Sequence, residues 1–138
     1  MNNKQDLLKL QASFLILQTK VKNFHWNLKD KNFFEIHEQL DKFYDDVSEQ
    51  LDALAEKLLM LDHNALGSYK DSLDLSLIQE AETQYYSAAQ VFEAVVYDLE
   101  KILDFIGNMK DISFRVQPLI DEVVIMVDTW LWKFKKSM

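Results

Sequence analysis

Residues 25–56, with the sequence HWNLKDKNFFEIHEQLDKFYDDVSEQLDALAE, carry two of the three histidines of this chain and many of its acidic residues. On a helix with 100° per residue, the apolar residues from 36 to 61 fall on one arc and a group of ligand-type residues falls on another. The ligand-type arc contains no lysine, and its members are His37, Asp41, Asp45, Asp52 and Glu56. An ordinary exposed helix face mixes lysines with glutamates, so this arc predicts a set of metal ligands.

The spacing along the helix divides these ligands into two groups. His25 and His37 flank a break near residues 30–32, so a tight helical hairpin brings the two imidazoles level. Asp52 and Glu56, four residues apart, form a second group on one helix face. His37 and Asp52 lie about 22 Å apart along a continuous helix, whereas a metal reaches only about 2 Å to each ligand. One chain therefore supplies two half-sites and no complete site.

A second copy of the chain can complete both half-sites. If two copies of this helix pack antiparallel about a twofold axis near residues 45–48, the histidine end of one meets the carboxylate end of the other. Twofold dimers are the most common homo-oligomers. We therefore predict a dimer interface that contains two whole metal sites.

Composition limits the class of protein. The chain has 138 residues, enough for one domain, with only two glycines and one proline, which favours long helices over sheet hairpins. It has no cysteine, so neither disulfides nor thiolate metal sites are expected. The sequence contains no apolar run of membrane-spanning length and no signal-peptide core, so we expect a cytoplasmic protein with no membrane partner. The net charge of −8 disfavours nucleic acid and suits a protein that attracts cations.

Apolar periodicity predicts four long helices within a single domain, residues 1–138. Their expected ranges are 3–27, 32–61, 77–106 and 113–135, with a short helix over 71–76 in the irregular stretch 62–76. Pro118 conflicts with a helix that begins at Ser113, so the last helix either begins near Pro118 or bends there. A link as long as 62–76 can cross a bundle from one end to the other. The predicted fold is an all-α four-helix bundle with a crossover between its second and third helices.

Imidazole nitrogen with carboxylate oxygen suits iron, manganese or zinc. A structural zinc site normally closes four ligands within one chain, and this sequence lacks such a cluster. Carboxylate-rich sites with histidine inside helical bundles are the usual setting for redox-active iron. Taken singly, each of these residues is more often a solvated surface group, so the prediction depends on their combined spacing. Trp26 and Tyr44 lie nearby in sequence, either as packing residues or as acceptors of radicals.

Three motifs resemble the signature of the Dps family, or miniferritins: NFHWN at 23–27, FFEIH at 33–37 and DALAE at 52–56. The resemblance implies a ferritin-like bundle with a short helix in the crossover. It also implies a dodecamer built from twofold dimers, which oxidises Fe(II) with hydrogen peroxide and stores the ferric mineral inside its shell. Such a ferroxidase removes iron and peroxide together and so protects against oxidative damage.

Matched by motif position, the family's ferroxidase residues fall on both predicted half-sites. The resemblance implies that His25, His37 and Asp41 come from one subunit, that Asp52 and Glu56 come from its partner, and that Trp26 lies beside the iron. These six residues are the expected catalytic set, and the first five are the expected metal ligands.

The chain also departs from the family pattern. Asp30 stands where the family often has a glycine after the first helix. Residues 114–120 replace an acidic helix start that helps to form an iron uptake pore, which leaves the acidic residues Asp121, Glu122 and Asp128. The mineral-nucleating residues expected on the inner wall are Asp45, Asp46 and Glu49.

Two other functions compete with iron storage. One is a nucleoid protein whose main ligand is DNA and whose iron site is secondary. The other is a helical assembly protein that has lost metal binding, which the intact set of five ligands disfavours. DNA binding in the family often depends on a lysine-rich terminal extension, whereas basic residues near the ends of this chain are few: Lys4, Lys133, Lys135 and Lys136.

We expect weak or no DNA binding at physiological salt, because a short basic end on an acidic protein neutralises few phosphates. An electrophoretic retardation assay with linear duplex DNA at about 150 mM salt should show free DNA only. Retarded complexes that persist at this salt concentration would contradict the prediction.

Overall fold

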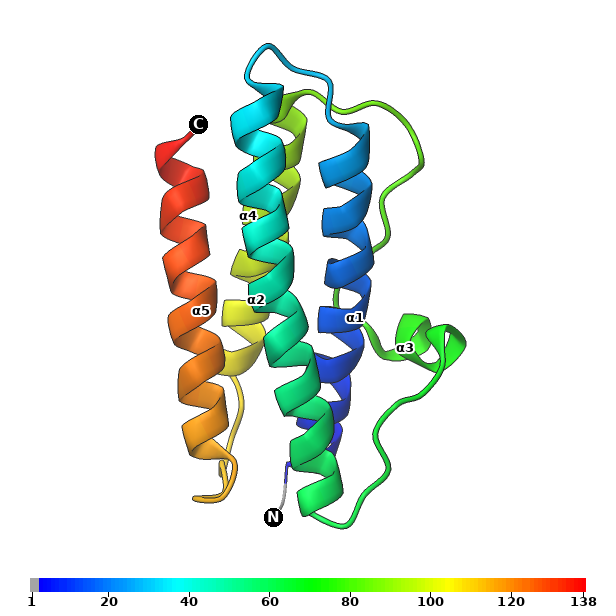
Figure 1. The fold of residues 1–138 in the computed structure, drawn as a ribbon. Helices are drawn as coiled ribbons and strands as arrows, with labels where there is room; N and C mark the ends of the chain where they lie inside the picture. The colour runs from blue at the N-terminus through cyan, green and yellow to red at the C-terminus, as the bar shows by residue number, and fades with distance from the viewer. Residues whose placement is uncertain (1–2) are drawn as a thin grey trace.

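The computed structural model describes residues 3–138 and consists of helices joined by irregular segments (Figure 1). The helices are α1 (Lys4–Asn27), α2 (Phe33–Met60), α3 (Tyr69–Leu75), α4 (Ala88–Gly107) and α5 (Gln117–Lys136). The four long helices form a bundle, and the short α3 packs on the outer side of α1. The all-α fold with a short helix in the crossover confirms the predicted fold class.

The connection between α2 and α4 runs the length of the bundle. It leaves the lower end of α2, passes through α3 and returns to the upper end, where α4 begins, so α2 and α4 point the same way (Figure 1). Polar contacts to α1 hold it in place. The Gln11 side chain bonds both the N–H and the C=O of Leu66, at 2.9 and 3.0 Å. The Ser13 hydroxyl accepts from the N–H of Leu77 at 2.9 Å, and thus α1 fixes both halves of the crossover.

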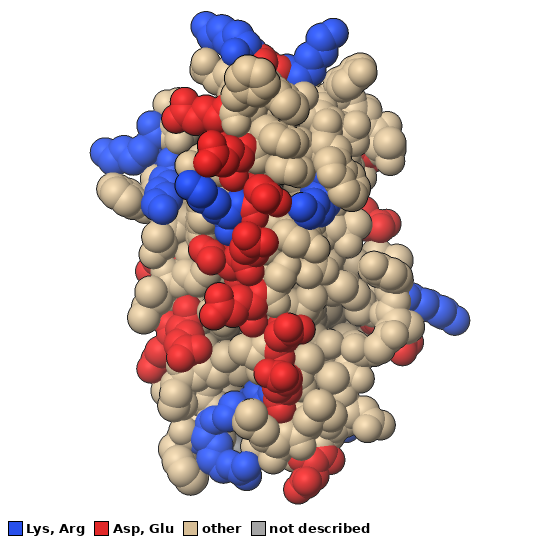
Figure 2. Space-filling view, in the orientation of Figure 1, with Lys and Arg blue, Asp and Glu red and all other residues tan. Residues whose placement is uncertain are grey.

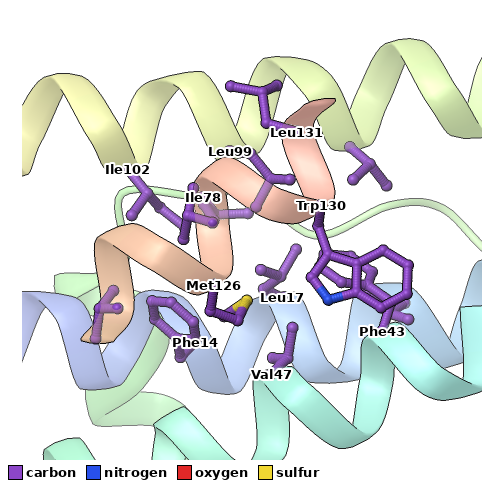
Figure 3. Packing of buried hydrophobic residues seen from close by; sticks show 14 of the residues in the cluster. Phe14, Leu17, Phe43, Val47, Ile78, Leu99, Ile102, Met126, Trp130 and Leu131 are labelled. Carbon is purple, nitrogen blue, oxygen red and sulfur yellow. The ribbon is translucent and has the colours of Figure 1, made fainter. Parts of the chain in front are cut away.

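The hydrophobic core lies between the four long helices (Figure 3). The apolar arc predicted for α2 is confirmed, since five of its members are buried: Leu40, Phe43, Val47, Leu54 and Leu58. They meet side chains such as Phe14, Leu17 and Leu99, all of which are fully enclosed. Each fully buried side chain of this size contributes about 1.5–3 kcal/mol to folding. Within residues 3–138, no helix is both long and apolar enough to cross a membrane.

The third long helix begins later than predicted, at Ala88 instead of Leu77. Residues 76–87 are irregular because Tyr86 pairs with the hairpin between α1 and α2: its N–H donates to Asn27 and its C=O accepts from Lys29. The capping box formed by Ser87 and Gln90 then starts α4. Tyr85, whose spacing would continue the apolar pattern of this helix, is 72% exposed.

The last helix begins near Pro118, which decides between the two alternatives predicted from the sequence. It starts at Gln117, with Pro118 in the first turn, where a missing N–H costs nothing. Ser113 instead accepts from Val116 and Gln117 in a preceding turn. The short crossover helix begins at Tyr69, two residues before the predicted start, because the Ser68 hydroxyl caps it by accepting from Asp71 N–H.

A buried ion pair joins α1 to α4. The Lys20 ammonium lies 2.8 Å from a carboxylate oxygen of Asp98, and the two side chains are 10% and 3% exposed. The Lys20 ammonium also donates to the C=O of Gln79 at 2.9 Å. Burial raises the pKa of Asp98, and the Lys20 charge opposes that rise.

Breaking this pair from one side should cost more stability than removing both charges. Lys20→Met leaves a buried carboxylate unpaired, so we expect the free energy of unfolding to fall by about 3 kcal/mol. Lys20→Met/Asp98→Leu should recover most of that loss, because neither charge then remains to be desolvated. Urea unfolding at fixed protein concentration measures both, and a double variant no more stable than Lys20→Met would refute the expectation.

Candidate metal centre

The hairpin between α1 and α2 is stabilised by the side chain of Asp30. One carboxylate oxygen accepts from the N–H of Asn32 at 3.0 Å, and the other accepts from the N–H of Ala88 at 3.4 Å. Asp30 does this without the positive φ that would favour glycine; the described residues with positive φ lie elsewhere, at Asn3, Asp62 and Asp111. An aspartate therefore replaces glycine here by supplying side-chain hydrogen bonds, and it links the hairpin to the start of α4.

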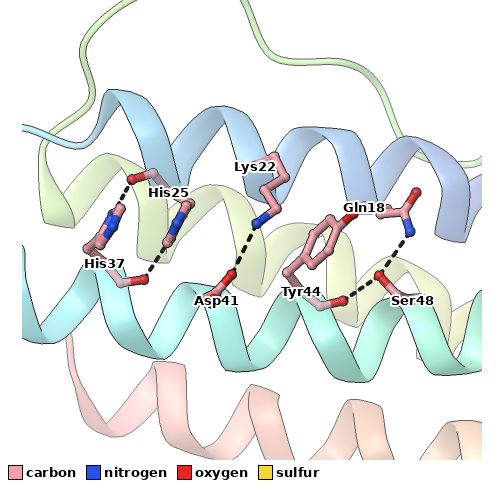
Figure 4. A network of polar contacts seen from close by, with 7 residues as sticks. All are labelled: Gln18, Lys22, His25, His37, Asp41, Tyr44 and Ser48. Carbon is pink, nitrogen blue, oxygen red and sulfur yellow. Dashed lines mark hydrogen bonds and ion pairs between the residues drawn. The ribbon is translucent and has the colours of Figure 1, made fainter.

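The hairpin brings His25 and His37 face to face, as the spacing predicts (Figure 4). Their rings stack at 3.6 Å between centroids and 11° between planes. Nδ1 of His25 lies 2.7 Å from the backbone oxygen of His37, and Nδ1 of His37 lies 2.7 Å from the backbone oxygen of His25. Phe33 stacks on His37 with the ring centroids 4.7 Å apart. Each ring is thereby held by the backbone of the other helix.

These two hydrogen bonds determine which ring nitrogen can bind a metal. A backbone oxygen only accepts, so Nδ1 of each histidine carries the proton. In a neutral imidazole the Nε2 atom then keeps its lone pair, and hydrogen bonding at the other nitrogen is how proteins orient metal-binding histidines. The pair therefore presents two Nε2 donors of fixed orientation.

Burial lowers the pKa of His25 below its ordinary value of 6.5. The neighbouring His37 and Lys22 lower this pKa further, while the hydrogen bond to the His37 backbone and the Asp41 charge partly oppose the change. A metal binds the neutral imidazole, so the environment of His25 favours the form that binds.

The expected ligand Asp41 lies one turn after His37 and faces α1. Its carboxylate oxygen is 3.0 Å from the ammonium of Lys22, and this contact holds the pKa of Asp41 below its usual range. The ammonium also lies 4.1 Å from the centroid of the Tyr44 ring. The sequence prediction did not include Lys22. Its position three residues before His25 places it on the same helix face and was the available signal.

The other two expected ligands remain away from the histidine pair. Asp52 and Glu56 are exposed on the second half of α2. Figure 2 shows a column of acidic side chains along this face of the molecule, over α2. Across residues 3–138, no three His, Asp or Glu residues of one chain come together closely enough to hold a metal. The histidine pair and the two carboxylates on the second half of α2 thus lie at separate places, and Asp41 does not complete a three-residue cluster with the histidines in the described part of the chain.

The remaining expected residues are mostly at the surface. The Trp26 side chain is 66% exposed and lines a surface pocket with Asn23 and with Glu80 and Ala81 of the crossover. Asp45, Glu49, Asp121, Glu122 and Asp128 are exposed, whereas Asp46 is half-buried and accepts from the indole N–H of Trp130 at 2.7 Å. Phe114, before the start of α5, is 85% exposed. Asp46 therefore has a structural partner, while the other acidic residues are accessible to ions.

The lowered pKa of His25 gives a pH-dependent term in stability. The unfolded chain protonates this histidine near pH 6.5, whereas the folded chain keeps it neutral to lower pH. The stability that His25 contributes is present at pH values above its pKa in the unfolded chain. It is lost as the pH falls through its pKa in the folded protein. Between about pH 7.5 and 5.5, metal-free wild type should lose more stability than His25→Asn, whose amide can donate to the His37 C=O but does not titrate. Urea unfolding at both pH values tests this, and equal losses would contradict it.

Comparison with known proteins identifies the family to which this fold belongs. Residues 4–117 match the family model for the ferritin-like domain. A DNA protection during starvation protein of Listeria monocytogenes is 30% identical over 130 residues, which cover 90% of this chain and 83% of the relative. The crystal structure of Dps from Staphylococcus aureus superposes with a TM-score of 0.77 at 31% identity, covering 98% of this chain and 94% of that one.

The likeness extends to more distant sequences, where it concerns the fold alone. Dps92 from Deinococcus radiodurans superposes with a TM-score of 0.88 at 22% identity, covering 97% of this chain and 84% of that one. The helical bundle and the crossover helix are thus accompanied by sequence similarity over most of the chain. The chain belongs to the Dps family of ferritin-like proteins.

Proposed function

We propose that this protein is a ferroxidase that oxidises Fe(II) at sites shared between two subunits. The ferric product is stored as mineral inside a dodecameric shell built from twofold dimers, in the cytoplasm, with residues 1–138 forming one ferritin-like domain. In each site, His25, His37 and Asp41 of one subunit and Asp52 and Glu56 of its partner bind iron, and Trp26 lies beside it.

The observation that carries this proposal is the reciprocal hydrogen bonding of the two histidines. Both Nδ1 atoms are committed to backbone oxygens at 2.7 Å, so both Nε2 atoms remain available as ligands. A pair of histidines that only packed would not need two matched bonds that fix the same tautomer in each ring. Nitrogen with carboxylate oxygen is a donor set that suits Fe(II).

The proposed reaction balances with hydrogen peroxide as oxidant. Two Fe(II) ions each give one electron, the O–O bond of one peroxide breaks, and two water molecules complete the product: two FeO(OH) units and four protons. Because iron and peroxide are consumed together, the reaction removes the reactants that generate hydroxyl radical.

Several relatives are named for the protection of DNA. If the protein consumes iron and peroxide in this way, it can protect DNA without binding it. The chain carries a net charge of −8, which opposes phosphate binding. Removal of iron and peroxide from solution protects any nearby molecule. We therefore assign protection to the chemistry of the site, and DNA binding as the main activity remains the alternative.

A subunit-mixing experiment tests whether the site is shared. His25→Ala and Asp52→Ala should each slow Fe(II) oxidation severely while the shell still assembles, because one removes a nitrogen donor and the other a carboxylate. Dissociating the two variants, mixing them in equal amounts and reassembling them should restore about a quarter of the wild-type rate, since half of randomly paired dimers are mixed and each mixed dimer holds one intact site.

Each variant dissociated and reassembled alone is the control and should remain inactive. Oxidation is followed by absorbance after peroxide is added to anaerobically loaded protein, with particle mass measured in parallel. Inactive mixed shells of correct mass would show that the ligands are not shared as proposed. Wild-type rates in either single variant would remove that residue from the chemistry.

A further inference from the structure

Lys22 places a positive charge within the proposed iron site. It lies on α1, one turn before His25, and its ammonium is 3.0 Å from Asp41 Oδ1 (Figure 4). The Lys22 side chain is 24% exposed and that of Asp41 is 51% exposed. The same ammonium lies 4.1 Å from the centroid of the Tyr44 ring. The lysine therefore has two partners at once, a carboxylate and an aromatic face.

An ammonium and a metal ion compete for the same carboxylate oxygen. With Lys22 on Oδ1 of Asp41, a divalent ion that uses this carboxylate must push the ammonium aside or accept a positive charge close by. The ammonium already lies over the Tyr44 ring, so it can leave Asp41 and keep this contact, because cations bind aromatic faces within about 6 Å of the centroid. Tyr44 is itself half-buried, and Ser48 donates to its backbone oxygen at 2.8 Å.

We propose that Lys22 determines which ions enter the site, by occupying Asp41 as a built-in cation that iron must displace. This inference rests on the proposed function. An ion gains entry only if its bonds to the other ligands outweigh the loss of the ion pair. Fe(II) and Co(II) gain strongly from imidazole nitrogen, whereas Mg²⁺ prefers oxygen ligands and gives up its water reluctantly. While Lys22 is paired with Asp41, Fe(II) and Co(II) keep the two imidazole ligands, whereas Mg²⁺ loses the oxygen ligand that it would use in this half-site, so Lys22 weakens Mg²⁺ binding more than Fe(II) binding.

The alternative is that Lys22 and Asp41 form an ordinary surface ion pair with no effect on metals. Such pairs contribute little to stability. The chain supplies a matched example in Lys42, which lies 3.9 Å from Glu38 on α2, with side chains 59% and 69% exposed. That pair involves no expected ligand. Comparing Lys22 with Lys42 separates the effect of position from the effect of net charge.

The test is anaerobic titration of the assembled protein with Co²⁺, followed by visible absorption, with and without excess Mg²⁺. Lys22→Gln should bind Co²⁺ more tightly by about fivefold, the upper range of a partly exposed ion pair. Mg²⁺ should compete more effectively in this variant than in wild type. Lys22→Arg keeps the charge and should retain the selectivity of wild type. Lys42→Gln removes the same charge elsewhere and should titrate like wild type.

The outcomes distinguish this inference from the proposed function. Wild-type protein that gives no Co²⁺ absorption would refute the shared metal site itself. If wild-type protein binds Co²⁺, but Lys22→Gln shows the same Co²⁺ affinity and the same Mg²⁺ competition as wild type, only the role of Lys22 is overturned. Equal gains in Lys22→Gln and Lys42→Gln would also overturn it, since net charge and not position would then be the cause.

Discussion

The two hydrogen bonds between the rings and backbones of His25 and His37 connect the fold of this chain to its chemistry. Each bond is 2.7 Å long and crosses from one helix of the hairpin to the other, so the distance between α1 and α2 sets the geometry of the imidazoles. The hairpin holds that distance through Asp30 and through the pairing of Tyr86 with the backbone at Asn27 and Lys29. The contacts that hold the hairpin therefore also position the two imidazoles.

The continuity of α2 imposes the second constraint. It is one uninterrupted helix from Phe33 to Met60, so the distance of about 22 Å between its histidine and carboxylate ends cannot be shortened within one chain. In the proposed assembly, two such helices pack antiparallel, so the carboxylate end of one lies next to the histidine end of the other. Function would then require assembly, and a free subunit would bind iron weakly at either half-site.

Much of this could be predicted from the sequence, because a 3.6-residue period is a local property. The apolar arc of α2, the level histidines and the crossover all follow from spacing. The predicted start of α4 was too early because Ala81 and Tyr85 continue the helical spacing. The backbone of this segment is instead hydrogen-bonded at Tyr86 to the α1–α2 hairpin. The capping box of Ser87 and Gln90 was visible in the sequence and marks the true start. Lys22 was missed because its position three residues before His25 shows only a shared helix face, and not that its ammonium meets Asp41 on the second helix.

The charge distribution of α2 gives a reason for dividing the site. This helix carries eight acidic residues and only two lysines, so gathering all its ligands at one point would concentrate negative charge in the absence of metal. In the proposed dimer, the carboxylates of one subunit face neutral imidazoles of the other, and Lys22 already neutralises the one acidic ligand beside those imidazoles. Each metal-free site would therefore carry only the two negative charges of Asp52 and Glu56. Iron binding would then exchange a resident ammonium for a divalent ion without having to overcome strong repulsion between the subunits.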